Sequence, residues 1–182
     1  MKTKLLALAL VGLFAINGAM AQEQGDIRGG LGLVLGTKAG INDDGDFKMG
    51  FGIVPSLEYV FTDAMSANLS YDWYFKSSVD GGDFTLSSFN IDYRYYFMTG
   101  DTQVYGLAGI GFMKGKFEVD GGGSTSSTET GLNIGVGAIF PLSDALGINA
   151  QLKYQTPKFQ NFSGDESANI AINAGVVYTF GN

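Results

Sequence analysis

The end of the chain alternates apolar residues with small or polar ones at every second position. This alternation runs from Asn169 to Phe180, and its apolar series ends on the aromatic pair Tyr178 and Phe180. A period of two is typical of a β-strand with one apolar face and one polar face. Because comparable runs recur along the chain, the sequence predicts a sheet in which every strand has one apolar face.

The N-terminus has the pattern of an export signal. Two lysines precede an apolar run, Leu5–Ile16, and Ala19-Met20-Ala21 fits an A-x-A cleavage site. We expect cleavage before Gln22, which leaves residues 22–182 as one mature domain. The apolar run of about a dozen residues is too short for a helix that spans about 30 Å of hydrocarbon, and no later segment reaches roughly 20 apolar residues. Membrane insertion is therefore expected through strands.

Charge and composition exclude several classes of function. The chain has 11 basic and 18 acidic residues, and loss of the leader with its two lysines lowers the net charge from −7 to −9. Such an acidic protein is not expected to bind nucleic acid, since duplex binding depends on Lys and Arg. There is no cysteine and no histidine, which excludes disulfides, thiolate chemistry and Ser-His-acid hydrolysis. We predict no enzymatic activity and no cofactor or metal.

Eight runs qualify as strands. They lie near residues 25–37, 46–61, 64–76, 84–98, 102–119, 130–141, 146–156 and 169–180. The run at 102–119 is ambiguous, because its even-numbered and odd-numbered apolar residues are equally plausible as the outer face. Pro55 falls within the second run, where it predicts a local irregularity because proline cannot donate to a strand ladder.

The connections between these runs alternate in length. Three are tight turns, namely Thr62-Asp63, Thr99-Gly100-Asp101 and Leu142–Ala145, whereas four are longer and polar, namely Lys38–Gly45, Ser77–Asp83, Asp120–Glu129 and Pro157–Glu166. Barrels of the outer membrane have short periplasmic turns and longer external loops. The sequence therefore predicts an all-β, eight-stranded antiparallel up-and-down transmembrane barrel with both termini in the periplasm. Within the third long loop, Gly121–Thr128 is expected to be a flexible tip.

Aromatic residues gather near the strand ends, where a membrane-interface girdle is expected. They are Phe61, Tyr95, Phe97, Phe140, Tyr178 and Phe180. One alternative is a sandwich with a buried aromatic core, which the export signal disfavours. A soluble lipocalin barrel is the other, and it would carry its polar face outside, which is the reverse of the pattern here.

The chain resembles the small eight-stranded outer-membrane barrels of the OmpA and OmpX kind. The resemblance covers the mature chain and is clearest in Ser88–Phe97 and Gly175–Phe180. It implies the same fold, and it implies that the terminal aromatic strand is a signal for the barrel assembly machinery. Barrel enzymes such as lipid A deacylases, palmitoyl transferases and omptin-type proteases use a histidine, so none can be matched to this chain.

Charged residues on the polar faces are expected to pair inside the barrel. An eight-stranded barrel has an interior just wide enough for its own side chains, and a buried unpaired charge is very unfavourable. Counted from the periplasmic turns, Arg28 and Glu58 lie low on adjacent strands with Arg94 nearby. We predict that these three form the lower of two ionic layers, with Arg28–Glu58 as its central pair.

A second ionic layer is predicted near mid-height of the barrel. There Lys153 is expected to lie between Asp72 and Asp92. Two functions remain open: a sealed barrel with a structural or surface-interaction role through its external loops, and a narrow channel for ions or small solutes whose selectivity these charges would set.

The expected location is the outer membrane of a Gram-negative-type bacterium. The expected partners are outer-membrane lipids, lipopolysaccharide and the assembly machinery, and the barrel is expected to be a monomer. Lys114, Lys116 and Lys158 lie near the predicted outer rim. They either contact lipopolysaccharide phosphates or act as solubilising charges, and we favour the second interpretation. Asn42–Asp46 has oxygen ligands that suit Ca²⁺ but lacks the regular spacing of a calcium loop, so we interpret it as a solvated turn.

Overall fold

The computed structural model describes residues 23–41, 46–156 and 168–180. The predicted leader at 1–21 and its cleavage site before Gln22 lie outside the described residues, as do most of the Asn42–Asp46 turn and Lys158. In the part of the chain that is described, no helix is long and apolar enough to cross a membrane.

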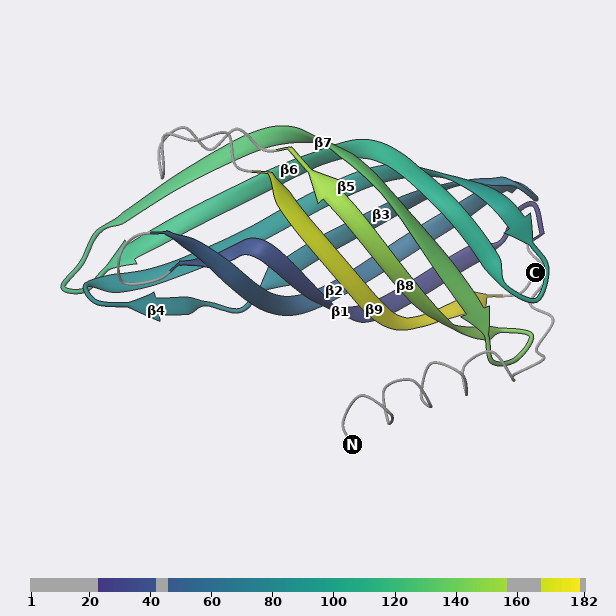
Figure 1. Ribbon diagram of the computed structural model, residues 1–182, viewed down its shortest axis with the longest axis horizontal. Helices are drawn as coiled ribbons and strands as arrows, with labels where there is room; N and C mark the ends of the chain where they lie inside the picture. Colours follow the sequence, from purple (N-terminus) through teal and green to yellow (C-terminus); the bar gives the residue numbers. More distant parts are fainter. Residues whose placement is uncertain (1–22, 42–45, 157–167, 181–182) are drawn as a thin grey trace.

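Nine strands form one antiparallel sheet that closes on itself (Figure 1). The strands are β1 (Ile27–Ile41), β2 (Phe47–Thr62), β3 (Met65–Tyr74), β4 (Ser77–Val79), β5 (Gly82–Thr99), β6 (Gln103–Val119), β7 (Ser124–Pro141), β8 (Leu146–Gln155) and β9 (Asn169–Phe180). Neighbouring strands follow chain order, and β1 pairs with β9. Strand β3 pairs directly with β5, and the short β4 pairs with the external end of β5. Eight long strands thus make an up-and-down barrel, which confirms the predicted fold.

Alternation along the strands decides which side chains face outward. Leu33 and Leu132 are 63% and 67% exposed, whereas Asp72 and Lys153 are fully buried. The arrangement is that of a barrel with an apolar exterior and a polar interior. On β6 the structure settles the face that the sequence left open: Ile110 and Phe112 are exposed, and Tyr105 and Leu107 are buried.

The loop predicted at Asp120–Glu129 is much shorter than expected. β7 begins at Ser124, which pairs with Glu118, so only residues 120–123 form the turn. Gly121, Gly122 and Gly123 all have positive φ, a conformation that glycine adopts without strain. The prediction of a flexible tip through Thr128 was therefore wrong, because the Ser and Thr residues suit a strand once β6 offers a partner.

Two other irregularities depart from the simple pattern. Pro55 keeps a regular register with β1. On the other side, Val54 and Pro55 have no paired residue in β3, although the β2–β3 register is the same before and after them. In β1 the register shifts between Gly36 and Gly40. Near this bulge Phe47, which the alternation assigns to the outer face, packs against Phe84 with ring centroids 6.1 Å apart.

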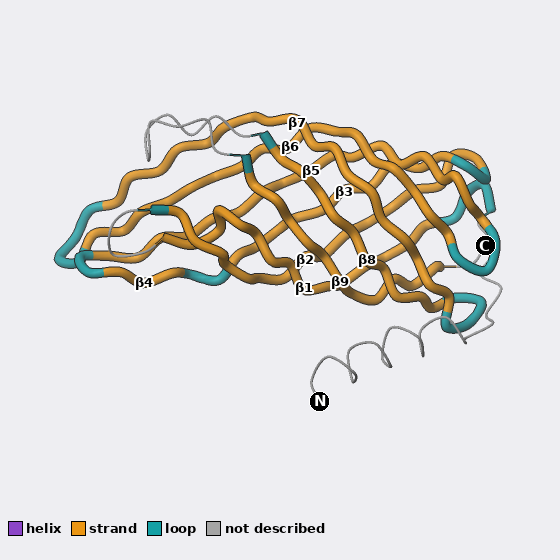
Figure 2. The backbone as a smooth tube through the Cα atoms, in the orientation of Figure 1, coloured by secondary structure: helices purple, strands orange, loops and turns teal. Residues whose placement is uncertain are grey.

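Strands β5, β6 and β7 extend beyond the others at the end of the barrel that carries the longer connections. They have 18, 17 and 18 residues, against 15 and 16 for β1 and β2, 10 each for β3 and β8 and 12 for β9. Figure 2 shows the turn between β6 and β7 far to the left of the external ends of β8 and β9. The two longer connections that the structure describes in full, Ser77–Asp83 and Asp120–Glu129, thus contribute strands to a projecting sheet rather than forming separate loops.

Candidate functional site

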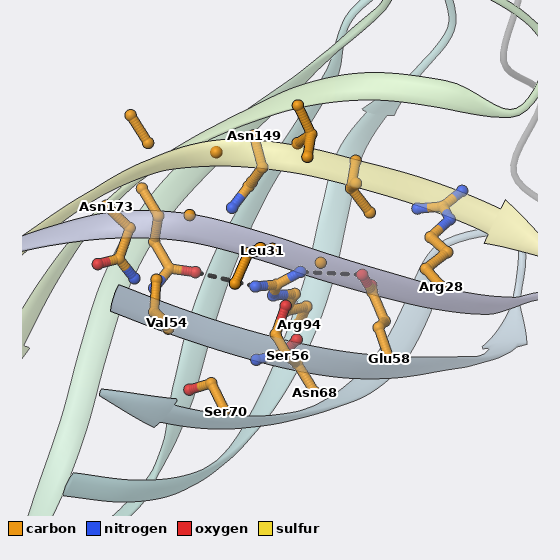
Figure 3. A pocket seen from close by; sticks show the side chains of 17 residues that line it. Arg28, Leu31, Val54, Ser56, Glu58, Asn68, Ser70, Arg94, Asn149 and Asn173 are labelled. Carbon is orange, nitrogen blue, oxygen red and sulfur yellow. Dashed lines mark hydrogen bonds and ion pairs between the residues drawn. The ribbon is translucent and has the colours of Figure 1, made fainter. Parts of the chain in front are cut away.

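The lower part of the barrel interior is organised around Glu58 of β2. Its carboxylate accepts hydrogen bonds from Arg94 Nη1 at 2.9 Å, Ser66 Oγ at 2.5 Å and Tyr96 Oη at 2.5 Å. All four side chains are buried, and Figure 3 shows Arg94 directed at Glu58 across the lumen. A buried carboxylate with three donors is well satisfied, because each donor replaces the water lost on burial.

The two arginines of this layer have different roles from those predicted. Arg28 lies opposite Glu58 in the β1–β2 register, but its guanidinium donates to Gln103 Oε1 at 3.0 Å and lies 4.0 Å from Asp26. The close ion pair of Glu58 is with Arg94, at 2.9 Å. The expected central pair is therefore corrected to Glu58–Arg94, because Arg94 reaches across the lumen from β5 while the long Arg28 side chain extends towards β6.

Arg94 links both sides of the lumen. Its Nη2 donates to Gln151 Oε1 at 3.0 Å on β8, and its guanidinium carbon lies 4.5 Å from the centroid of the Tyr105 ring. The Tyr105 hydroxyl in turn donates to Asn149 Oδ1 at 2.7 Å. A guanidinium that is stacked on an aromatic ring and hydrogen-bonded through both of its terminal nitrogens has little freedom to move. The Arg94 side chain is therefore held in one position across the lumen.

The mid-height layer brings together the three residues expected there. Lys153 Nζ lies 3.2 Å from Asp72 Oδ2 and 3.8 Å from Asp92 Oδ2, and all three side chains are buried. Neither contact of Lys153 has the geometry of a hydrogen bond, so both are ion pairs. Amide donors supply the hydrogen bonds instead: Asn90 Nδ2 donates to Asp72 at 3.2 Å and Asn133 Nδ2 to Asp92 at 2.8 Å.

A ladder of amide side chains, which was not predicted from the sequence, joins this layer to the upper lumen. Gln155 Nε2 donates to Asn90 Oδ1 at 3.0 Å, and Asn169 Nδ2 donates to Gln155 Oε1 at 2.8 Å. These residues occupy inward positions of β5, β8 and β9. Their signal in the sequence was an Asn or Gln at alternating positions of the polar faces.

Two apolar clusters lie in the lumen, one interleaved with the lower ionic layer and one on the external side of the mid-height layer. The cluster near the periplasmic turns consists of Tyr96, Tyr105, Leu107, Ile139 and Val177. The cluster near the external end consists of Val34, Ala39, Val54, Tyr74, Phe84, Leu86, Met113 and Ala171, against which Phe47, Val79 and Phe117 pack. Neither cluster was predicted, because alternation along the strands assigns polar residues to the inner face.

A small cavity lies in the lumen beside the lower ionic layer and is lined by residues of β1, β2, β3, β5, β8 and β9 (Figure 3). Its volume is about 30 Å³, enough for about two water molecules. Asn68 Oδ1, Ser70 Oγ and Asn173 Oδ1 are buried beside it without a hydrogen-bond partner in the protein. The cavity is therefore polar and suited to hydration. Among the described residues no group of three or more acidic side chains is arranged to hold a metal ion.

The predicted girdle residues lie on the outer surface at the periplasmic ends of their strands. Tyr95, Phe97, Tyr178 and Phe180 are about half exposed, Phe61 is 38% exposed and Phe140 is half-buried. Three edge-to-face pairs form within strands, namely Tyr59–Phe61, Tyr95–Phe97 and Tyr178–Phe180, with ring centroids 5.1–5.7 Å apart. Their contact with the lipid interface remains a prediction.

The hairpin formed by β4 and β5 has a pH-sensitive ion pair that lies outside the membrane-spanning part of the barrel. Lys76 Nζ donates to Asp83 Oδ2 at 2.7 Å, which lowers the pKa of Asp83 below its ordinary 3.8 and raises the pKa of Lys76 above 10.5. Because the Asp83 pKa is depressed by folding, its stabilising contribution is complete above pH 3.8 and is lost as the pH falls through the lower, folded value.

We therefore expect the β4–β5 pairing to loosen reversibly in acid while the barrel stays closed. Amide NMR of the protein in micelles would show shifts of Ser78 and Asp83 below pH 3.8, with the β1–β9 amides unchanged. The Asp83→Asn variant should lack this transition. The same titration in that variant would contradict the assignment.

Gly36 of β1 provides a test of interior packing. A Cβ at this position would lie 2.8–2.9 Å from ring and hydroxyl atoms of Tyr74, which is itself fully buried. We expect Gly36→Ala to destabilise the barrel by about 1–3 kcal/mol, because overpacking forces the ring to shift. The matched control is Gly100→Ala, since nothing lies within 4 Å of a Cβ there. Urea unfolding of both variants measures the difference, and equal stabilities would contradict this account.

The closed sheet, the apolar exterior and the paired interior charges define a transmembrane β-barrel. Residues 6–180 match the family described as "Outer membrane protein beta-barrel domain", and the chain belongs to this family. It is a protein of the Gram-negative outer membrane. No curated protein sequence matches the chain.

Solved structures of low sequence identity share the fold. Ail, the attachment invasion locus protein of Yersinia pestis, is 22% identical with a TM-score of 0.61, over 86% of this chain and 99% of Ail. Neisserial surface protein A is 16% identical with a TM-score of 0.64, over 85% and 96% of the two chains. OprG of Pseudomonas aeruginosa is 14% identical with a TM-score of 0.63, over 90% and 99%. At these identities the likeness concerns the fold alone.

Proposed function

We propose that this protein is a non-conducting outer-membrane barrel that presents its projecting β5–β7 sheet at the cell surface for interaction. The observation that carries the proposal is the filling of the lumen. Two ionic layers and two apolar clusters occupy it, and the largest fully buried side chains include Arg28, Tyr74, Tyr105 and Lys153. A hydrophobic constriction opposes the entry of ions and water, so the interior serves stability rather than passage.

Single-channel recording tests this proposal. We expect the mature protein, refolded and inserted into a planar bilayer, to give no discrete conductance steps, with heat-modifiable gel mobility as the check that the barrel has folded. The second candidate is a narrow channel, which the polar cavity lined by Asn68, Ser70 and Asn173 favours. Discrete steps that change with Lys153→Ala or Arg94→Ala would establish the channel and overturn the sealed barrel.

The proposed partners within the membrane follow from the outer surface. Lys114 is exposed on β6 two residues beyond Phe112, whereas Lys116 is paired with Glu118 at 2.5 Å. An exposed lysine just above the apolar band is suited to a lipid or lipopolysaccharide phosphate, although this pattern also fits a solubilising charge. We propose in addition that β9, with Tyr178 and Phe180 outward, is the strand that the assembly machinery recognises, and that the barrel is a monomer without catalytic activity.

A further inference from the structure

Lys153 is buried at mid-height of the lumen without a hydrogen bond to any described residue. Its Nζ lies 3.2 Å from Asp72 Oδ2 and 3.8 Å from Asp92 Oδ2, and the three side chains have no exposed surface. Buried ions in folded proteins are normally hydrogen-bonded as well as paired. An amine that is packed against two carboxyl groups, yet is hydrogen-bonded to neither, is placed for a chemical reaction as well as for an ion pair.

The two carboxyl groups differ in how their oxygens are used. Asp72 Oδ2, the oxygen paired with the lysine, accepts a hydrogen bond from Asn90 Nδ2 at 3.2 Å, and Asp72 Oδ1 has no donor among the described residues. Asp92 is arranged the other way: Asn133 Nδ2 donates to Oδ1 at 2.8 Å, and the paired Oδ2 has no donor in the described part of the chain. Asn90 can therefore stabilise negative charge that develops on Asp72 Oδ2, whereas Asp92 Oδ2 is available to accept a proton.

We propose that Lys153 and Asp72 condense to an isopeptide bond, which ties β8 to β3 across the lumen, and that Asp92 carries protons in this reaction. One proton passes from Nζ to Asp92 Oδ2, and the resulting amine attacks Cγ of Asp72. The Nζ–Cγ bond forms, the Cγ–Oδ1 bond breaks, and Oδ1 leaves as water with the two protons that Nζ has lost. An ammonium and a carboxylate thus become one amide and one water, so the step needs no oxidant and no cofactor.

Burial favours this reaction in its rate and in its equilibrium. Reacting atoms held about 3–3.5 Å apart avoid the entropy cost of an encounter, and Nζ lies 3.2 Å from an oxygen of the carboxyl group that it attacks. Two buried ions carry a large desolvation penalty, which a neutral amide does not. The cavity beside the lower ionic layer is lined by none of the three residues, so it brings no water into contact with the new bond. The bond is independent of the proposed surface function.

Mass spectrometry of the mature protein detects the bond directly. The protein is refolded in detergent micelles, checked by heat-modifiable gel mobility and sampled over several days. We expect its intact mass to fall by the mass of one water molecule. Trypsin cleaves after lysine and arginine, so a digest of the denatured product should contain residues 49–76 joined to residues 117–158, without cleavage after Lys153. Freshly refolded protein still contains the ion pair, so it is the sample in which the stability of the ionic layer is measured.

Three controls test whether the bond depends on the folded site. Lys153→Arg keeps the positive charge in a group that stays protonated, and it should give neither the mass loss nor the linked peptide. Wild-type protein kept in urea for the same time should not react either, and this control remains if the variant fails to fold. Asp92→Asn should form the linked peptide about 100-fold more slowly, since a positioned proton carrier contributes about 10²–10⁴ in rate.

Several results would overturn the proposal. A folded wild type that keeps its full mass and is cleaved after Lys153 contains only the ion pair. A mass loss without the linked peptide is dehydration elsewhere in the chain, such as at an Asp-Gly turn. A link from Lys153 to residues 77–94, which contain Asp92, contradicts the assignment of the two carboxyl groups, as does an Asp92→Asn variant that reacts as fast as the wild type. Conductance of the barrel bears on the proposed function alone.

Discussion

Replacing Lys153 by methionine is expected to destabilise the folded barrel by about 3–5 kcal/mol, because it leaves buried carboxylates without their cation. Lys153 is the only basic side chain within 4.0 Å of Asp72 or Asp92 among the described residues, and all three groups are fully buried. Methionine nearly preserves the volume of lysine, so the loss measures charge rather than packing. The free energy is obtained by urea unfolding of the refolded protein, followed by the fluorescence of Trp73, the one tryptophan in the chain.

Neutralising the whole layer is the control for this prediction. The triple variant Lys153→Met, Asp72→Asn, Asp92→Asn removes all three charges at similar volume, and it should regain most of the lost stability because no uncompensated charge remains. Lys114→Met, an exposed lysine on the outer face of β6, should change stability by less than about 0.5 kcal/mol. A triple variant as unstable as the single one would show that the ionic layer does not act as a unit.

The fold followed from the sequence because one physical constraint dominates it. In a membrane every backbone polar group must be paired within the protein, which allows strands only in a closed barrel. Alternation of residues such as Met65, Leu69 and Trp73 with Ser66, Asn68 and Asp72 then assigns the inner and outer faces without further information. The number of strands and the closed topology needed no tertiary contact to be inferred.

The ends of the strands could not be inferred in the same way. Ser124–Thr128 has the composition of a loop, and only pairing with the neighbouring β6 makes it a strand. Local composition does not report such pairing, because β-propensity depends strongly on the partner. The face of β6 was ambiguous for a related reason: both of its faces carry apolar residues, since Leu107 and Met113 belong to the apolar clusters of the lumen.

The interior charges show what strand position alone can and cannot specify. Height along the strands placed Lys153 with Asp72 and Asp92, because three residues at one level of a narrow lumen have few other partners. At the lower level, two arginines were possible partners for the one carboxylate of Glu58, and height could not decide which of them would reach it. Arg94 forms the pair with Glu58 because its side chain can extend across the lumen, which depends on the inward glycines and tyrosines around it.

Glu58→Gln is expected to destabilise the barrel by about 3–5 kcal/mol, because it leaves the buried Arg94 without its anion and turns one acceptor oxygen into an amide donor. The three donors to Glu58 would then compete for a single remaining acceptor. A double-mutant cycle identifies the partner that matters. Coupling between neighbours in one network is about 0.5–3 kcal/mol, and we expect a larger value for Glu58 with Arg94 than for Glu58 with Arg28.

The measurement compares Glu58→Gln, Arg94→Met and Arg28→Met with the two double variants under the same unfolding conditions. If Arg94 holds the ion pair, the Glu58→Gln, Arg94→Met variant should be more stable than Glu58→Gln alone, because the stranded cation has been removed. The Glu58→Gln, Arg28→Met variant should show less recovery, since Arg28 keeps its own contacts with Gln103 and Asp26. Equal recovery from both double variants would mean that Glu58 interacts equally strongly with the two arginines. The shorter distance to Arg94 would then not correspond to a larger interaction free energy.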